Sequence, residues 1–211
     1  MPGVVGVILA AGRARRFGSP KVLATLDGRP LLQHVVDRLG AAGVDELIVV
    51  LGADAAAAED AVTWPPSTSR VLNPAPERGL ASSLAIGAAT ALARTPRPEA
   101  LLIALGDQPR IDPAVIGALL ATDPSHAVAV PRYPTGADPN PVLLRRAAFG
   151  LLEEVTGDRG LRPVLAHHPE LVVEVPVAGA NPDVDTPADL AALEGATAGA
   201  TAGPDTRHPV P

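Results

Sequence analysis

The stretch VVGVILAAGRARRFGSPKVL, from Val4 to Leu23, decides the fold. It opens with a continuous apolar run, Val4–Leu9, which is typical of a strand buried on both faces of a parallel sheet. The chain then turns through small residues and places several cations close together. Ligands of such sheets bind beyond the carboxyl ends of the strands. We therefore expect an anionic ligand at this turn.

Apolar runs alternate with segments of helical periodicity along the rest of the chain. Strands are expected at 46–51, 70–72, 100–105, 127–130, 142–144 and 171–175. Helices are expected at 31–39, 53–62, 80–92, 113–120, 151–155, 161–166 and 187–193. This alternation predicts a single α/β domain, Rossmann-like and three-layered, with a mostly parallel mixed sheet. The domain should span residues 1–194, and residues 195–211, which are rich in Gly, Ala, Thr and Pro, should form a disordered tail.

The composition excludes several classes of function. The chain of 211 residues has 2% aromatic residues, too few for a base-stacking nucleic-acid surface, and a net charge of −6, so any anion site must be local. It has no cysteine, which rules out disulfides, thiolate metal sites and a cysteine nucleophile, and fits a cytoplasmic protein. The run Val4–Ala11 has no basic residue before it and reads as a strand rather than a signal peptide. No apolar segment approaches the roughly 20 residues of a membrane span.

The cation loop differs from the two familiar phosphate loops. Gly12 and Gly18 are too few and too far apart for a G-x-G-x-x-G fingerprint, and Ser19-Pro20 separates Gly18 from Lys21, which breaks a Walker A motif. The physics is related, because small residues let the backbone approach a ligand. Arg16 can grip phosphate oxygens bidentately and Lys21 adds a point charge. Arg13 and Arg15 are expected to be surface residues.

The motifs, taken in order, resemble a known family. Leu9-Ala10-Ala11-Gly12 with Arg16, Gly18 and Lys21 is similar to the L-A-A-G-x-x-x-R-x-G-x-x-K signature of nucleotidyltransferases with the glycosyltransferase-A-like fold. The later motifs resemble the molybdenum cofactor cytidylyltransferases, and they are NPAPERGLASSLAIG (73–87), LGDQP (105–109), PNPVLL (139–144), GDRGLR (157–162) and DVDTPADL (183–190). The resemblance covers Val4 to about Leu193.

This resemblance implies a site and substrates. It gives Arg16, Lys21 and Asp107 catalytic roles, and it assigns nucleotide binding to Leu9, Ala10, Ala11, Gly12, Arg16, Lys21, Gly79, Ser83 and Asp107. CTP would be the donor, since Leu-Ala-Ala-Gly accompanies CTP and Leu-Ala-Gly-Gly accompanies GTP in the related enzymes. A molybdopterin-type acceptor and a molybdoenzyme partner are also implied. The alternatives are a guanylyltransferase or other nucleotidyltransferase, and a non-catalytic nucleotide-binding accessory protein of a molybdoenzyme. A dinucleotide-dependent oxidoreductase is disfavoured by the glycine spacing.

Two acidic loops are the expected metal site. Mg²⁺ prefers oxygen ligands and needs only one or two protein carboxylates when a phosphate substrate completes its shell. The resemblance gives this role to Asp107 and Asp185, with Asp183 a weaker candidate. The alternatives are a turn aspartate beside Pro109, and helix-dipole stabilisation before the helix that Thr186-Pro187 begins.

The acceptor side is expected to use Asn140, Asp158 and Arg162. Asn140 departs from the Gly-His-Pro-Val pattern of the resembled branch, and it can hydrogen bond but not titrate near neutrality. Asp158 has the alternative of capping the short helix that follows it, and Arg162 that of an ordinary surface arginine. Ser83 holds the family position at a helix start, whereas Ser82 is equally well explained as an N-terminal cap. His34 is expected to be structural.

Overall fold

The computed structural model describes residues 3–12, 17 and 20–201, with side chains described up to residue 195. Arg13, Arg15, Arg16, Gly18 and Ser19 of the cation loop lie outside the described residues, as does the last part of the expected tail. Among the helices formed by the described residues, none combines the length and apolar character that a membrane span needs.

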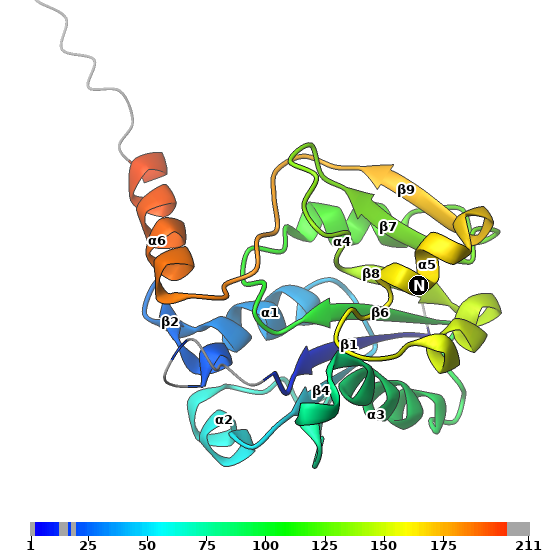
Figure 1. Cartoon of the computed structure of the whole chain (residues 1–211), viewed down its shortest axis with the longest axis horizontal. Coiled ribbons are helices and arrows are strands. Elements are labelled where there is room, and N and C mark those ends of the chain that lie inside the picture. The colour runs from blue at the N-terminus through cyan, green and yellow to red at the C-terminus, as the bar shows by residue number, and fades with distance from the viewer. Residues whose placement is uncertain (1–2, 13–16, 18–19, 202–211) are drawn as a thin grey trace, which may run out of the picture.

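A seven-stranded sheet forms the centre of the domain (Figure 1). Its strands, in the order in which they lie side by side, are β5 (Thr68–Leu72), β4 (Glu46–Leu51), β1 (Val4–Ala10), β6 (Ala100–Leu105), β8 (Val142–Arg145), β7 (Val128–Arg132) and β9 (Val172–Pro176). β8 runs antiparallel to both of its neighbours, and the other pairs are parallel. The expectation of a mostly parallel mixed sheet in one α/β domain is confirmed.

Helices cover both faces of the sheet, so the domain has three layers (Figure 1). One face carries α1 (Leu31–Gly40), α2 (Ala55–Ala61) and α4 (Pro113–Leu120), and the other carries α3 (Leu80–Leu92), α5 (Arg162–His167) and the 3-10 segment η3 (Arg146–Glu154). Val5, Val7 and Leu9 of β1 pack with α3, whereas Val4 and Ile8 pack on the opposite face. This alternation along a strand is the period of two that a pleated strand imposes.

Smaller elements complete the fold. A two-stranded ribbon, β2 (Thr25–Leu26) with β3 (Arg29–Pro30), follows the short 3-10 helix η1 (Lys21–Leu23). The remaining short helices are η2 (Pro76–Arg78) and η4 (Pro169–Leu171). The last helix, α6 (Pro187–Thr201), stands at one end of the molecule and packs through Leu190 and Leu193 onto Leu26 and Val184 (Figure 1). It extends beyond Leu193, where we expected it to end, because three alanines follow that residue and no proline interrupts the helix before Thr201.

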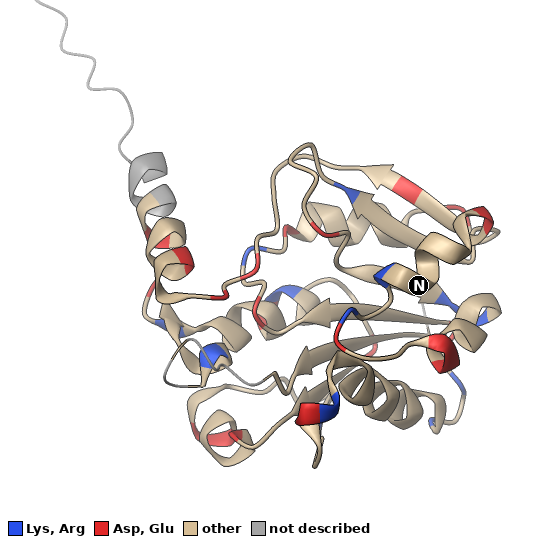
Figure 2. Ribbon diagram, in the orientation of Figure 1, with Lys and Arg blue, Asp and Glu red and all other residues tan. Residues whose placement is uncertain are grey.

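Charged residues avoid the middle of the sheet. β1 and β6 contain none, and Figure 2 shows both as strands of the neutral colour, with acidic and basic residues on the surrounding loops and helices. The charges that follow β1 and β6 in sequence therefore meet at the carboxyl edge of the sheet, where both parallel strands end.

Candidate active site

Lys21 lies between two carboxylates at the carboxyl edge of the sheet. Its ammonium nitrogen is 2.6 Å from Oδ2 of Asp107 and 2.8 Å from Oδ1 of Asp185. The side chain is only 13% exposed, and it is the sole lysine of the sequence. Burial alone would lower the pKa of Lys21, but the two carboxylates raise it above its ordinary value. The site therefore holds a firmly charged lysine.

Asp107 follows β6 and connects the two acidic loops. Its backbone carbonyl accepts a hydrogen bond from the amide of Val184 at 3.1 Å, which holds the loop of Asp183 and Asp185 against it. Its Oδ1 atom is buried and has no hydrogen-bond partner among the described residues. A buried carboxylate oxygen without a donor is costly, so this atom is available to a cation or a ligand donor.

The acidic loop before α6 is anchored by Asp189. The carboxylate of Asp189 accepts hydrogen bonds from the amides of Asp185 and Thr186 and from the Thr186 hydroxyl, at 3.0, 2.7 and 2.9 Å. The Thr186 hydroxyl accepts in turn from the Asp189 amide at 3.2 Å, which completes a capping box. These bonds, above all those from Thr186, lower the pKa of Asp189. Because Asp189 does the capping, the Asp185 side chain is left to bind Lys21.

Asp183 faces a different set of neighbours from Asp185. Its Oδ1 accepts a 2.7 Å hydrogen bond from Gln108, and Gln108 in turn accepts one from the buried Asn181 at 3.0 Å. Burial, followed by repulsion from Asp107, raises the pKa of Asp183 to about 6. The sequence motif LGDQP contains Gln108, but nothing in it indicates the distant Asn181 as its partner.

A cleft of about 480 Å³, here called the lysine cleft, opens above these charges. Every described member of the expected nucleotide set lines it, and the full lining is Leu9, Ala10, Ala11, Gly12, Lys21, Val22, Pro76, Glu77, Gly79, Leu80, Ser83, Leu105, Asp107, Asp158 and Asp185. The Ser83 hydroxyl is buried and accepts a 2.9 Å hydrogen bond from the Asn73 amide. The structure thus brings together residues from six separate segments of the sequence, namely 9–12, 21–22, 76–83, 105–107, 158 and 185.

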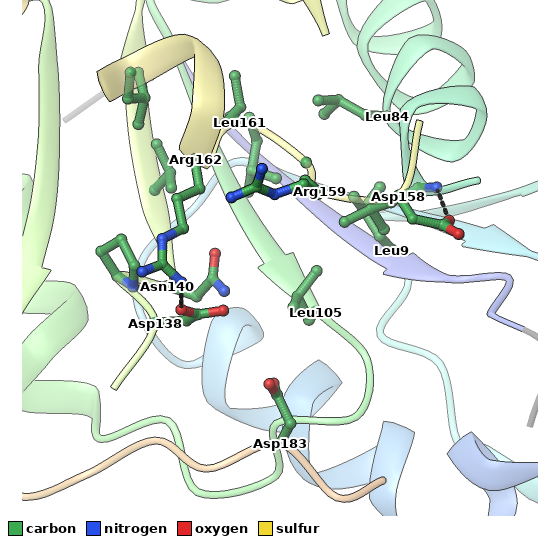
Figure 3. A pocket seen from close by; sticks show the side chains of 16 residues that line it. Leu9, Leu84, Leu105, Asp138, Asn140, Asp158, Arg159, Leu161, Arg162 and Asp183 are labelled. Atoms are coloured by element: carbon green, nitrogen blue, oxygen red, sulfur yellow. Dashed lines mark hydrogen bonds and ion pairs between the residues drawn. The ribbon is translucent and has the colours of Figure 1, made fainter. Parts of the chain in front are cut away.

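The start of α3 differs from both sequence expectations. Ser82 does not cap it. Ser82 is a residue of the helix itself, and its hydroxyl donates a hydrogen bond to the carbonyl of Gly79 at 2.7 Å instead of accepting one from a helix amide. The cap comes from Asp158, whose Oδ1 accepts from the amide of Leu80 at 3.0 Å (Figure 3). Asp158 therefore caps α3 and not the helix that follows it, since α5 has no side-chain cap. The side-chain cap of α3 thus comes from a loop that is distant in sequence and not from the residues next to the helix start.

A second cleft, of about 310 Å³ and here called the arginine cleft, adjoins the first (Figure 3). Its lining contains the three residues expected on the acceptor side, and consists of Leu9, Leu80, Leu84, Ile103, Leu105, Asp138, Pro139, Asn140, Val142, Asp158, Arg159, Gly160, Leu161, Arg162, Leu165 and Asp183. Arg162 forms an ion pair with Asp138, but its side chain is 62% exposed, so the alternative of a surface arginine stands beside the acceptor role. Arg159, for which the sequence motifs predicted no role, also extends into this cleft (Figure 3).

Buried amides support the wall of the arginine cleft that carries Asn140. The backbone carbonyl of Asn140 accepts hydrogen bonds from the Tyr133 hydroxyl at 2.8 Å and from the Asn181 amide at 3.3 Å. Burial raises the pKa of Tyr133 to about 12, so this phenol remains a donor. Asn181 therefore links the Asn140 wall to Gln108 and the acidic loops.

The donor set is suited to a hard divalent cation. In the described part of the chain, no group of three or more His, Cys, Asp and Glu residues could hold a metal, but two carboxylates already converge on one cation, the ammonium of Lys21. Two oxygen donors suffice for Mg²⁺ when phosphates and waters complete its shell. His34 takes no part, since its Nε2 pairs with the carbonyl of Leu26 at 2.8 Å, in agreement with the structural role expected of it.

A mostly parallel sheet whose first strand ends in a small-residue turn, next to a largely buried lysine and two carboxylates, is the arrangement of a nucleotidyltransferase. Comparison with known proteins agrees: residues 6–172 match the model of the MobA-like NTP transferase domain, and the chain belongs to this family. It is a nucleotidyltransferase of the MobA-like type with the glycosyltransferase-A-like fold.

Relatives in this family carry different names. The chain is 30% identical over 198 residues to a nicotine blue oxidoreductase of Paenarthrobacter nicotinovorans, covering 88% of this chain and 94% of that protein. It is 30% identical over 205 residues to a probable molybdenum cofactor guanylyltransferase of Trichormus variabilis, covering 92% of each. Among solved structures, Rv0371c of Mycobacterium tuberculosis superposes with a TM-score of 0.80 at 32% identity, covering 92% of this chain and 98% of that one. Rv0371c has also been solved in complex with manganese, with a TM-score of 0.77 at 31% identity.

Proposed function

We propose that the protein transfers a cytidylyl group from CTP to the phosphate of a molybdopterin-type acceptor and releases pyrophosphate. The observation that carries this proposal is the convergence of Lys21, Asp107 and Asp185 inside a cleft lined by the Leu9–Gly12 turn. An adjoining cleft presents two arginines beside three aspartates, and these arginines are the groups that could bind a phosphorylated acceptor.

In the proposed reaction, an oxygen of the acceptor phosphate forms a bond to the α-phosphorus of the nucleotide. The bond from that phosphorus to the bridging oxygen breaks, and pyrophosphate leaves with the electron pair. The acceptor supplies the nucleophile, so no side chain has to form a covalent intermediate. The protein contributes orientation and charge neutralisation.

Each part of the two clefts has a role in this scheme. Lys21, together with Arg16, would bind the triphosphate and offset the charge that builds on the leaving pyrophosphate. The Leu9–Gly12 turn and the segment from Gly79 to Ser83 would frame the base and ribose. Asn140 and Arg162 would orient the acceptor from the other side.

Asp107 and Asp185 would hold Mg²⁺. The buried Oδ1 of Asp107 and the shared contact of both carboxylates with one cation support this assignment, as does the manganese complex of Rv0371c. When bound, the ion would supply positive charge next to the phosphate oxygens, in addition to that of Lys21.

GTP is a second candidate donor, because the Trichormus relative is named a guanylyltransferase. CTP is favoured by Ala11, a buried residue in the lining of the lysine cleft, at the position where the GTP-using relatives carry glycine. An oxidoreductase activity, which the Paenarthrobacter relative's name suggests, lacks a dinucleotide fingerprint in this sequence.

The test is pyrophosphate release from each of the four nucleoside triphosphates with Mg²⁺, with and without molybdopterin. Acceptor-dependent release from CTP supports the proposal. Release from GTP alone supports the second candidate. Binding of CTP without pyrophosphate release, in the presence of molybdopterin, would instead favour a non-catalytic accessory protein.

A further inference from the structure

The two clefts share a wall formed by the loop 157–162 and the start of α3. Leu80 and Asp158 line both clefts, so one short piece of structure faces both the lysine cleft and the arginine cleft. Arg159 of the loop and Arg162, the first residue of α5, extend into the arginine cleft (Figure 3). The helix start carries Gly79 and Ser83, which line the lysine cleft.

The loop supplies hydrogen-bond acceptors that the helix start lacks. Gly79 is the N-cap residue of α3 and offers no side chain, which leaves the first amides of the helix without a local acceptor. Asp158 Oδ1 accepts from the Leu80 amide at 3.0 Å, and the carbonyl of Gly157 accepts from the Ala81 amide at 2.9 Å. The cap comes from a residue 78 positions away in sequence, so it forms only when the loop is in place.

Close packing joins the same two segments. Gly79 has a φ of +91°, and a Cβ atom there would lie 2.7 Å from both the Gly157 carbonyl oxygen and Asp158 Oδ1. On the other side of the contact, a Cβ atom on Gly160 would lie 3.0 Å from the Leu80 side chain. The loop and the helix start therefore fit together at van der Waals distance, and neither can shift without the other.

We propose that Asp158 is a positioning residue that couples the two clefts. By capping α3 it makes the loop 157–162 and the segment 79–83 one unit, so that a ligand that orders either segment also orders the other. Such coupling is reciprocal, and a nucleotide and an acceptor would each strengthen the binding of the other. The identity of the two ligands rests on the proposed function. The coupling between the loop 157–162 and the segment 79–83 rests only on the contacts between these two segments.

The test is amide hydrogen exchange on the intact chain. Without ligand, Asp158→Ala should speed exchange in both 79–83 and 157–162, whereas Asp158→Asn, which keeps a carbonyl acceptor, should change neither by much. Asp112→Ala is the matched control, because Asp112 caps α4 through the Ala114 amide at 2.8 Å and lines neither cleft. Faster exchange confined to Leu80, or equal acceleration of both segments in Asp112→Ala, would overturn the coupling.

A second arm uses α,β-methylene-CTP, a CTP analogue that cannot release pyrophosphate. Its binding to the wild type should slow exchange in 160–162, on the arginine side of the wall, and Asp158→Ala should abolish this effect and weaken binding by about fivefold or more. Slow exchange limited to the lysine cleft would contradict the proposal. If neither this analogue nor GTP binds the wild type, the proposed function fails, and the ligand-free comparison still decides the role of Asp158.

Discussion

Replacing Lys21 with alanine should have opposite effects on catalysis and on metal binding, two properties that a substitution in an active site usually weakens together. Lys21 contacts Asp107 and Asp185 at 2.6 and 2.8 Å, so its ammonium occupies the position between the two proposed metal ligands. A divalent ion that uses both carboxylates must displace it. The variant should therefore lose turnover but bind the metal more tightly than the wild type in the absence of nucleotide.

The structure sets the size of each effect. A unit-charge pair at about 4 Å is worth roughly 4 kcal/mol at an effective dielectric constant of about 20, and a lysine that is 13% exposed lies in such an intermediate environment. Desolvation and the 61% exposure of Asp185 remove much of this attraction. A net competition of about 1.4 kcal/mol or more remains, which is a tenfold tightening of Mg²⁺ binding. Loss of the charge that faces the leaving pyrophosphate should lower kcat by about 100-fold or more.

The same change should lower stability in a way that metal reverses. Without Lys21, Asp107 keeps a buried oxygen and loses its counter-charge, so the free energy of unfolding should fall by about 2 kcal/mol. Mg²⁺ at ten times its dissociation constant should restore about 1.4 kcal/mol. In the wild type, the same Mg²⁺ concentration should have a smaller effect, because the lysine competes.

The assay can use the fact that Lys21 is the only lysine. Incorporation of lysine labelled at Cε and Nζ gives one side-chain NMR signal, which should shift when Mg²⁺ displaces the ammonium. Isothermal calorimetry of Mg²⁺ binding to wild type and Lys21→Ala, together with pyrophosphate release, completes the comparison. The reasoning is refuted if the variant binds Mg²⁺ no more tightly than the wild type, or if it still releases pyrophosphate at the wild-type rate.

Three further substitutions test other parts of the site. Asp183→Asn should flatten the pH dependence of the unfolding free energy. Because the folded pKa of about 6 lies above the usual 3.8, Asp183 stabilises the fold below about pH 4, and this contribution is lost as the pH rises to 6. Urea unfolding at pH 4 and pH 7 should therefore show the wild type losing up to about 1 kcal/mol relative to the variant, after allowance for solvent screening. Ala11→Gly should raise the GTP-to-CTP ratio of kcat/KM by up to about tenfold in the nucleotide panel, and an unchanged ratio would remove Ala11 from donor choice. Gly79→Ala should cost about 1–3 kcal/mol in denaturant unfolding because of its positive φ and the contacts of its Cβ with the loop 157–162, whereas equal stability would show that the wall can relax.

The strands and long helices could be predicted because their signals are local. Glu46–Leu51, Ala100–Leu105 and the helix from Leu80 to Leu92 have the bounds that their apolar patterns indicate. The ribbon of β2 and β3 was missed because each strand has two residues, which is too short for any periodicity. Helix α6 was predicted too short, since glycine and threonine among its alanines resemble a linker.

The clustering of the site could be predicted only in outline. Residues after β1 and β6 had to meet at the carboxyl edge, and the structure places Lys21 and Asp107 there. The contacts that align the acidic loop could not be inferred, because Gln108 and Asp183 lie 75 residues apart and their hydrogen bond depends on tertiary packing. The same holds for Asp158, whose partner is a helix start far away in sequence rather than the helix beside it.

The direction of β8 explains why the second cleft exists where it does. Apolar periodicity fixes which residues of a strand are buried, but it does not fix the direction of the strand. In the sheet, Val142 pairs with Ile103 and Arg145 pairs with Ala100, so β8 begins near the carboxyl end of β6. The loop that carries Asn140 precedes β8 and therefore lies beside the Asp107 loop, with Asn181 joining the two. A parallel β8 would place that loop at the opposite edge, and the arginine cleft would have no wall next to the lysine cleft.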